Sequence, residues 1–66
     1  MSKKHFVAMA AEIRRMLAEM DRMGDSADRI DGARQMALGV SDVCARFNVN
    51  FDRDRFLTAC GLTEAN

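Results

Sequence analysis

Helical periodicity is the feature that most narrows what this chain can fold into. Along residues 3–23, apolar side chains recur at alternating steps of three and four, which places them on one face of an α-helix. Residues 26–47 repeat these steps, and no stretch alternates polar and apolar residues for long enough to form a strand. At 66 residues the chain has room for one domain. The sequence therefore predicts an all-α fold and a single small domain over residues 1–66.

The two long stretches predict an antiparallel helical hairpin, because only about three residues join them. Ser2 is the expected N-cap of the first helix, Gly24 its left-handed ending, and Asp25 or Ser26 the cap of the second. The apolar stripe of the first helix consists of Phe6, Met9, Ile13, Met16, Met20 and Met23, with Ala10 and Leu17 beside it. That of the second consists of Ile30, Ala33, Ala37, Val40, Cys44 and Phe47, flanked by Met36 and Val43.

Clear start and stop signals predict a short third helix over residues 53–60 that caps the hairpin. Asp52 is a suitable N-cap, and Phe51 and Phe56 are spaced to form a hydrophobic staple across it. Gly61 fits a left-handed C-terminal ending, with Leu62 placed to contact Leu57 as in a Schellman motif. Residues 63–66 are expected to fray.

A chain this short has more apolar helix surface than three helices can cover. Below roughly 70–80 residues a single core rarely supplies more than ~3–5 kcal/mol, so small domains recruit disulfides, metals or partners. We therefore expect a homodimer or other homo-oligomer. Gly32 and Gly39 are either tolerated weak points of the second helix or places where another backbone approaches closely. The candidate interaction surface comprises Leu38, expected to be exposed, with Gly39, Met9, Met16 and Met20.

The residues with reactive side chains do not form a recognisable catalytic or metal-binding pattern. His5 is expected to be exposed to solvent, and Cys44 and Cys60 to be reduced thiols that pack as small hydrophobes, with a disulfide between them as the alternative. No phosphate loop, zinc-type cysteine pair or calcium loop is present. We predict no enzyme activity, catalytic residue, cofactor or metal. No apolar run approaches the ~20 residues of a membrane helix.

A small dimeric DNA-binding regulator is the alternative function. Ten basic residues balance ten acidic ones, so the net charge gives no general attraction to nucleic acid. The alternative gains only if the arginines converge on one face of the fold; these are Arg14, Arg15, Arg34, Arg53 and Arg55. A small-ligand site at a dimer interface is a third possibility.

Both ends of the chain carry motifs that resemble those of a family of small uncharacterised proteins encoded by bacteriophages, prophages and plasmids. The start contains Lys3-Lys4-His5-Phe6, and the end contains Phe51-Asp52-Arg53-Asp54-Arg55-Phe56-Leu57-Thr58-Ala59-Cys60-Gly61. The resemblance covers about a third of the chain and implies a mobile-element origin, a cytoplasmic location and no catalytic residues. The leading hypothesis is a non-enzymatic protein-interaction module that inhibits or modulates a host protein.

Overall fold

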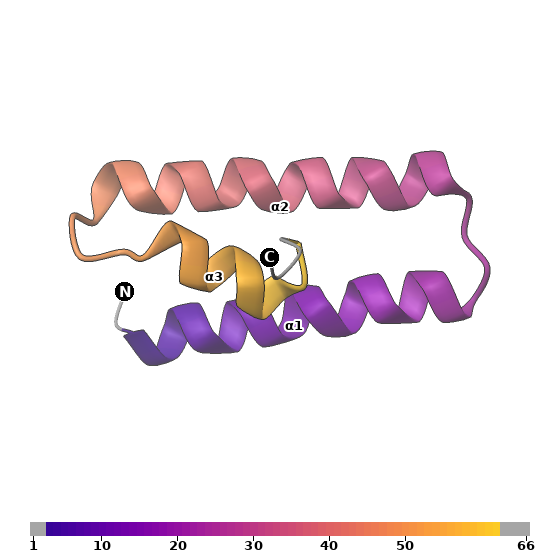
Figure 1. Cartoon of the computed structure of the whole chain (residues 1–66), viewed down its shortest axis with the longest axis horizontal. Coiled ribbons are helices and arrows are strands. Elements are labelled where there is room, and N and C mark those ends of the chain that lie inside the picture. The colour runs from indigo at the N-terminus through magenta and orange to yellow at the C-terminus, as the bar shows by residue number, and fades with distance from the viewer. Residues whose placement is uncertain (1–2, 63–66) are drawn as a thin grey trace.

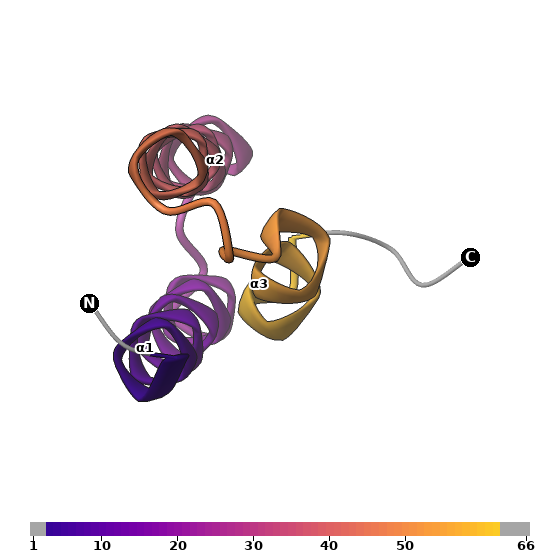
Figure 2. The same ribbon diagram turned by 90° about the vertical axis from the view of Figure 1, so that its left-hand side faces the viewer.

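The structure is a computed structural model that describes residues 3–62. Helices α1 (Lys3–Arg22) and α2 (Ala27–Phe47) run antiparallel, and the short α3 (Arg53–Cys60) lies against one side of the pair (Figures 1 and 2). The residues that the structure describes contain no strand. The predicted all-α fold is confirmed, with helix bounds within a residue of those expected. The expected cap Ser2 and the expected fraying at residues 63–66 lie outside the described part of the chain.

The turn between α1 and α2 is determined by short-range sequence signals. Gly24 adopts a left-handed conformation with φ of 76°, and the amide of Asp25 donates to the carbonyl of Met20 at 3.0 Å. The left-handed glycine and this hydrogen bond together form a Schellman ending, and glycine adopts the left-handed conformation at low cost. The Oγ of Ser26 then accepts a hydrogen bond from the Arg29 amide at 3.3 Å, which caps α2. These contacts reverse the chain within four residues.

Both ends of α3 form as the sequence predicts. The Asp52 carboxylate accepts a hydrogen bond from the Arg55 amide at 3.0 Å, and Gly61 takes a left-handed conformation with φ of 78°. The amide of Leu62 donates to the carbonyl of Leu57 at 2.9 Å, which completes a Schellman ending. These contacts determine where an eight-residue helix starts and stops, although so short a helix is unstable in isolation.

The core lies mainly between α1 and α3. It is formed by the buried side chains of Ala10, Phe56, Leu57 and Cys60, against which Phe6, Met9, Ile13, Leu38, Phe51 and Leu62 pack in part. The ring of Phe51 lies 4.7 Å from that of Phe6 and 5.2 Å from that of Phe56, measured between centroids. Phe51 thus forms the predicted staple and also links α3 to the start of α1.

Candidate interaction surface

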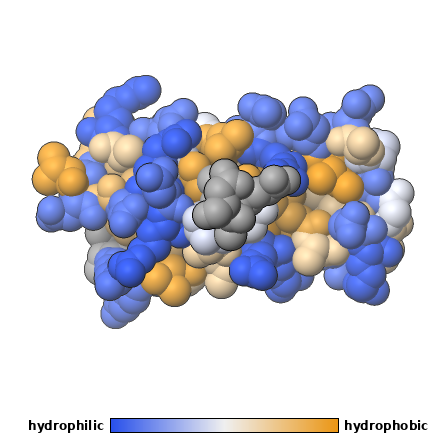
Figure 3. Space-filling model, in the orientation of Figure 1, coloured by the Kyte–Doolittle hydropathy of each residue, from blue (hydrophilic) through white to orange (hydrophobic). Residues whose placement is uncertain are grey.

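The two long helices have a covered side and an open side. Figure 2, seen nearly along the helix axes, shows α3 on one side of the α1–α2 pair and no helix on the other. Figure 3 views the side that carries α3, where polar and charged surface is interrupted by apolar patches. The chemical character of the open side therefore depends on which side chains of α1 and α2 point away from α3.

Helix α2 buries two small side chains and leaves three large apolar ones exposed. Its buried residues are Ala37 and Ser41, and the Ser41 Oγ donates to the Leu38 carbonyl at 2.6 Å. Phe47 is 81% exposed, Met36 72% and Val43 49%. Burying an apolar side chain of this size is worth about 1.5–3 kcal/mol, so the exposed stripe is a large unused source of binding energy.

The predicted packing stripe of α2 is therefore wrong in part. The inward part of the predicted stripe is confirmed. Ala37 is buried, and four further members are half-buried: Ile30, Ala33, Val40 and Cys44. Phe47, placed in the same stripe, is exposed, as are the flanking Met36 and Val43. Two apolar stripes overlap on this helix, and the one that packs against α1 and α3 is centred on the buried Ala37 and Ser41.

We name the exposed apolar residues of α2 the α2 stripe; it consists of Met36, Val40, Val43 and Phe47, with Val40 half-buried at its inner edge. Consecutive members are four, three and four residues apart, so they follow one line along the helix. Sequence reasoning assigned these residues to the intramolecular packing of the hairpin and did not identify them as a surface. The sequence contains one indication of this orientation, because Ala37 and Ser41 form an alternative inward face with smaller side chains.

The three methionines of α1 that were expected to contribute to the interaction surface, Met9, Met16 and Met20, divide into two groups. Met9 is half-buried and packs against the core, and Met20 is also half-buried. Met16 is exposed, as is Met23, which directly follows the end of α1. On the helical wheel Met16 and Met23 turn away from the side of α1 that carries Ala10, the buried residue of its contact with α3. They therefore add flexible apolar surface to the open side.

Leu38 and Gly39 differ from each other in environment. The expectation that Leu38 is an exposed contact residue is wrong, because it is half-buried and packs against the core between α1 and α3. Gly39 is exposed, and a Cβ built on it, or on Gly32, would meet no atom within 4 Å. Neither glycine therefore accommodates a close backbone approach within the chain, although both leave room for a second molecule.

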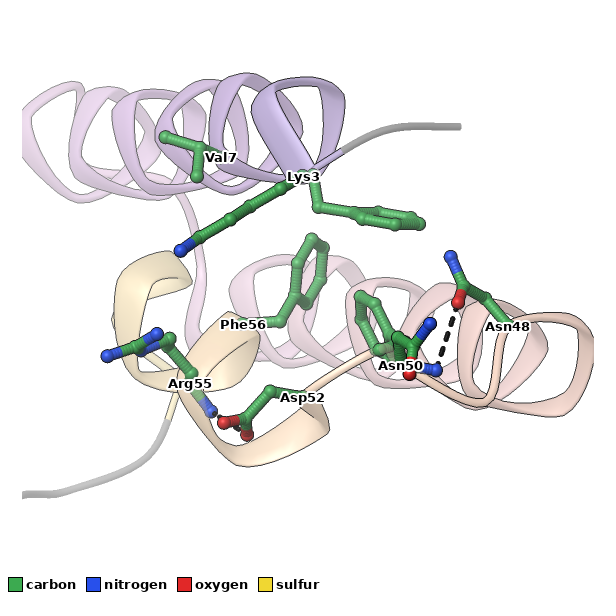
Figure 4. Close-up of a pocket in the computed structure, with 9 residues that line it drawn as sticks. Lys3, Val7, Asn48, Asn50, Asp52, Arg55 and Phe56 are labelled. Atoms are coloured by element: carbon green, nitrogen blue, oxygen red, sulfur yellow. Dashed lines mark hydrogen bonds between the residues drawn. The ribbon is translucent and has the colours of Figure 1, made fainter.

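A second feature is a groove of about 510 Å³ at the end of the molecule where α1 begins and α3 starts. Its walls come from α1, the α2–α3 loop and α3, and Figure 4 shows Phe56 pointing toward α1 inside it. Lys3, Asp52 and Arg55 contribute polar groups at its edge. The Asp52 carboxylate is already used to cap α3, so the groove offers chiefly aromatic and aliphatic surface.

The reactive side chains are dispersed. His5 is exposed as expected, Cys44 is half-buried on α2, and Cys60 is buried in the core. Burial raises the pKa of the Cys60 thiol, so it stays protonated at neutral pH and is a poor nucleophile. Within residues 3–62, no three histidine, cysteine or acidic side chains lie close enough together to hold a metal ion.

Two of the five arginines of the DNA-binding alternative are paired with acidic side chains, and two others, Arg14 and Arg34, line one pocket. Arg15 pairs with Glu12 at 2.7 Å, and Arg53 pairs with Asp42 at 2.8 Å. The pKa of the Glu12 carboxyl is lowered by its hydrogen bond to Arg15. Arg34 donates to a backbone carbonyl, that of Leu62, at 3.5 Å. Pairing with acids leaves Arg15 and Arg53 with less positive charge to offer to phosphates.

Comparison of the chain with protein-family models, with curated proteins and with solved structures found no match. Over the described residues, no helix combines the length and the apolar character needed to cross a membrane.

Proposed function

We propose that this protein is a non-enzymatic, cytoplasmic protein-interaction module that acts as a homo-oligomer and binds through the open side of its helical hairpin. The observation that supports this proposal is the orientation of α2, which leaves Met36, Val43 and Phe47 exposed to solvent while Ala37 and Ser41 are buried. An isolated exposed leucine or valine is ordinary, whereas several large apolar residues in line along one helix are typical of a binding surface.

The spacing of the α2 stripe also indicates the kind of partner. Residues at steps of four and three along a helix form the seam along which a second helix packs. The partner surface is therefore expected to be helical and apolar. With the mobile-element resemblance of the two terminal motifs, we propose that one such partner is a host protein that this chain inhibits or modulates.

A pair of double variants tests the proposal. Val43→Lys/Phe47→Lys places two charges on the α2 stripe, whereas Gln35→Lys/Ala45→Lys adds the same charge at exposed positions of α2 away from it. Both should keep the helix content of the wild type. Light scattering on size-exclusion fractions measures self-association, and quantitative capture from host lysate measures other partners.

We expect the wild type and the Gln35/Ala45 variant to self-associate and to retain the same host proteins, and the Val43/Phe47 variant to lose both properties. If the Val43/Phe47 variant behaves like the wild type in both assays, the α2 stripe is not the binding surface. If all three proteins are monomers and retain nothing above background, the interaction function itself is wrong.

A further inference from the structure

We propose that a second copy of this chain covers the α2 stripe by docking its own α2 against it in antiparallel orientation. This inference rests on the proposed function and names the partner and geometry of the same surface. The argument uses the sizes and charges of the residues along α2 and on its rim.

The apolar seam of α2 is longer than the exposed stripe alone. Extended by one step to Ala33, it runs through Ala33, Met36, Val40, Val43 and Phe47, at steps of three, four, three and four, with Ala33 and Val40 half-buried along its inner edge. These are the alternating steps of the a and d positions in paired helices. No charged side chain interrupts this line over fifteen residues, which span about 21 Å of helix.

Side-chain size selects the antiparallel orientation. With a two-fold axis at Val40, the large Phe47 of one copy lies opposite the small Ala33 of the other, and Met36 lies within one residue of the level of Val43. A parallel pair would instead place Phe47 on Phe47 and Ala33 on Ala33, which crowds one end and leaves a gap at the other. The antiparallel seam is therefore complementary to itself, as an isologous interface requires.

Charges on the rim of the seam favour the same orientation. Asp28 and Arg46 are both exposed and lie eighteen residues apart, which is five full helical turns, so they share one side of α2. An antiparallel pair brings the basic end of one rim toward the acidic end of the other, and it also opposes the two helix dipoles. In a parallel pair the rims that carry Asp28 and Arg46 would lie on opposite sides of the seam, so the two charges of different copies would not approach each other.

The same rim is free of obstruction. Gly32 and Gly39 lie between Asp28 and Arg46 on this side of α2, and, beyond the neighbouring residues and backbone of α2 itself, no atom of residues 3–62 lies within 4 Å of the place where a Cβ would be. Glycines at these positions lower the helix propensity of α2 without any intramolecular packing to compensate. Close approach of α2 of the second copy gives both glycines a structural role. Gly39 lies next to the two-fold axis.

A charge exchange at two exposed positions tests the geometry. Met36→Glu and Val43→Lys are made singly and together, and Met36→Glu/Val43→Glu is the matched like-charge control. Within one chain the two positions are seven residues, or about 10 Å, apart along the helix, too far for a direct ion pair. Any rescue in the double variant must therefore come from pairing between copies. Sedimentation equilibrium gives the dimer dissociation constant, and circular dichroism confirms that each variant is folded.

We expect each single variant to weaken the dimer about tenfold or more, and Met36→Glu/Val43→Lys to recover most of that loss, because each glutamate meets a lysine of the other copy. The like-charge control should remain monomeric. If the wild type dimerises but the Glu/Lys and Glu/Glu variants are equally weak, antiparallel pairing of α2 is wrong, while self-association stands. If the wild type is a monomer at millimolar concentration, pairing with a second copy is overturned, and capture of host proteins through the α2 stripe is judged separately.

Discussion

Replacing each of two phenylalanines by alanine gives the most direct test of how the structure divides its apolar residues. Phe56 is 4% exposed and packs between α1 and α3, whereas Phe47 ends α2 with its ring in solvent. Periodicity alone places both rings in the interior. The same chemical change should therefore lower the free energy of unfolding greatly at Phe56 and very little at Phe47.

The magnitudes follow from burial. Removing a buried phenylalanine ring costs about 3–5 kcal/mol, through lost transfer energy and the cavity that remains. A domain of this size rarely has more than ~3–5 kcal/mol of total stability, so Phe56→Ala is expected to be largely unfolded in water. Phe56 also contacts Phe51, whose ring links α3 to Phe6 of α1, so its loss weakens the attachment of α3 as well. Phe47→Ala, at an exposed site, should change the free energy of unfolding by about 0.5 kcal/mol or less.

Urea unfolding followed by far-ultraviolet circular dichroism measures both effects. The protein concentration must lie below the dissociation constant of the proposed dimer, so that the unfolding free energy is that of one chain. A loss of stability in Phe47→Ala comparable to that in Phe56→Ala, under these conditions, would refute the outward orientation of the α2 stripe. A destabilisation of Phe47→Ala that appears only at higher protein concentration would instead support its burial by a second copy.

Three further predictions concern local structure and pH. Gly61→Ala should lower the free energy of unfolding by about 1–2 kcal/mol, because its left-handed backbone disfavours a Cβ. Gly32→Ala, on an open helical surface, should raise it by up to about 1 kcal/mol in dilute solution, and urea titrations compare the two variants. Asp52→Ala should lower the free energy of unfolding by about 1 kcal/mol through loss of the α3 cap. Asparagine also caps helices, so an equal loss of stability in Asp52→Asn would contradict capping as the cause. The raised pKa of the Cys60 thiol means that its stabilising effect is complete below the unfolded pKa of about 8.5 and declines as the pH rises toward the folded pKa. Thermal melts between pH 7 and 10 should show this decline in the wild type and a flatter profile in Cys60→Ala, and iodoacetamide should modify Cys44 faster than Cys60.

The sequence by itself determined the helices and their ends. Gly24 and Gly61 permit left-handed endings, and Ser26 and Asp52 supply side-chain oxygens to amides three residues ahead, so these contacts form within a few residues of chain. The staple between Phe51 and Phe56 is equally local, which is why α3 could be predicted in detail. The short α1–α2 turn likewise requires an antiparallel pair.

Only the tertiary structure decided how α2 is rotated about its own axis. Its sequence carries two overlapping apolar stripes, and both satisfy helical periodicity. In the folded chain the small side chains of Ala37 and Ser41 take the inner position, and Leu38 reaches the α1–α3 core from the flank, so Met36, Val43 and Phe47 are left outside. Periodicity identifies which residues share a line along a helix, whereas the choice of the line that faces inward depends on the space that the neighbouring helices leave.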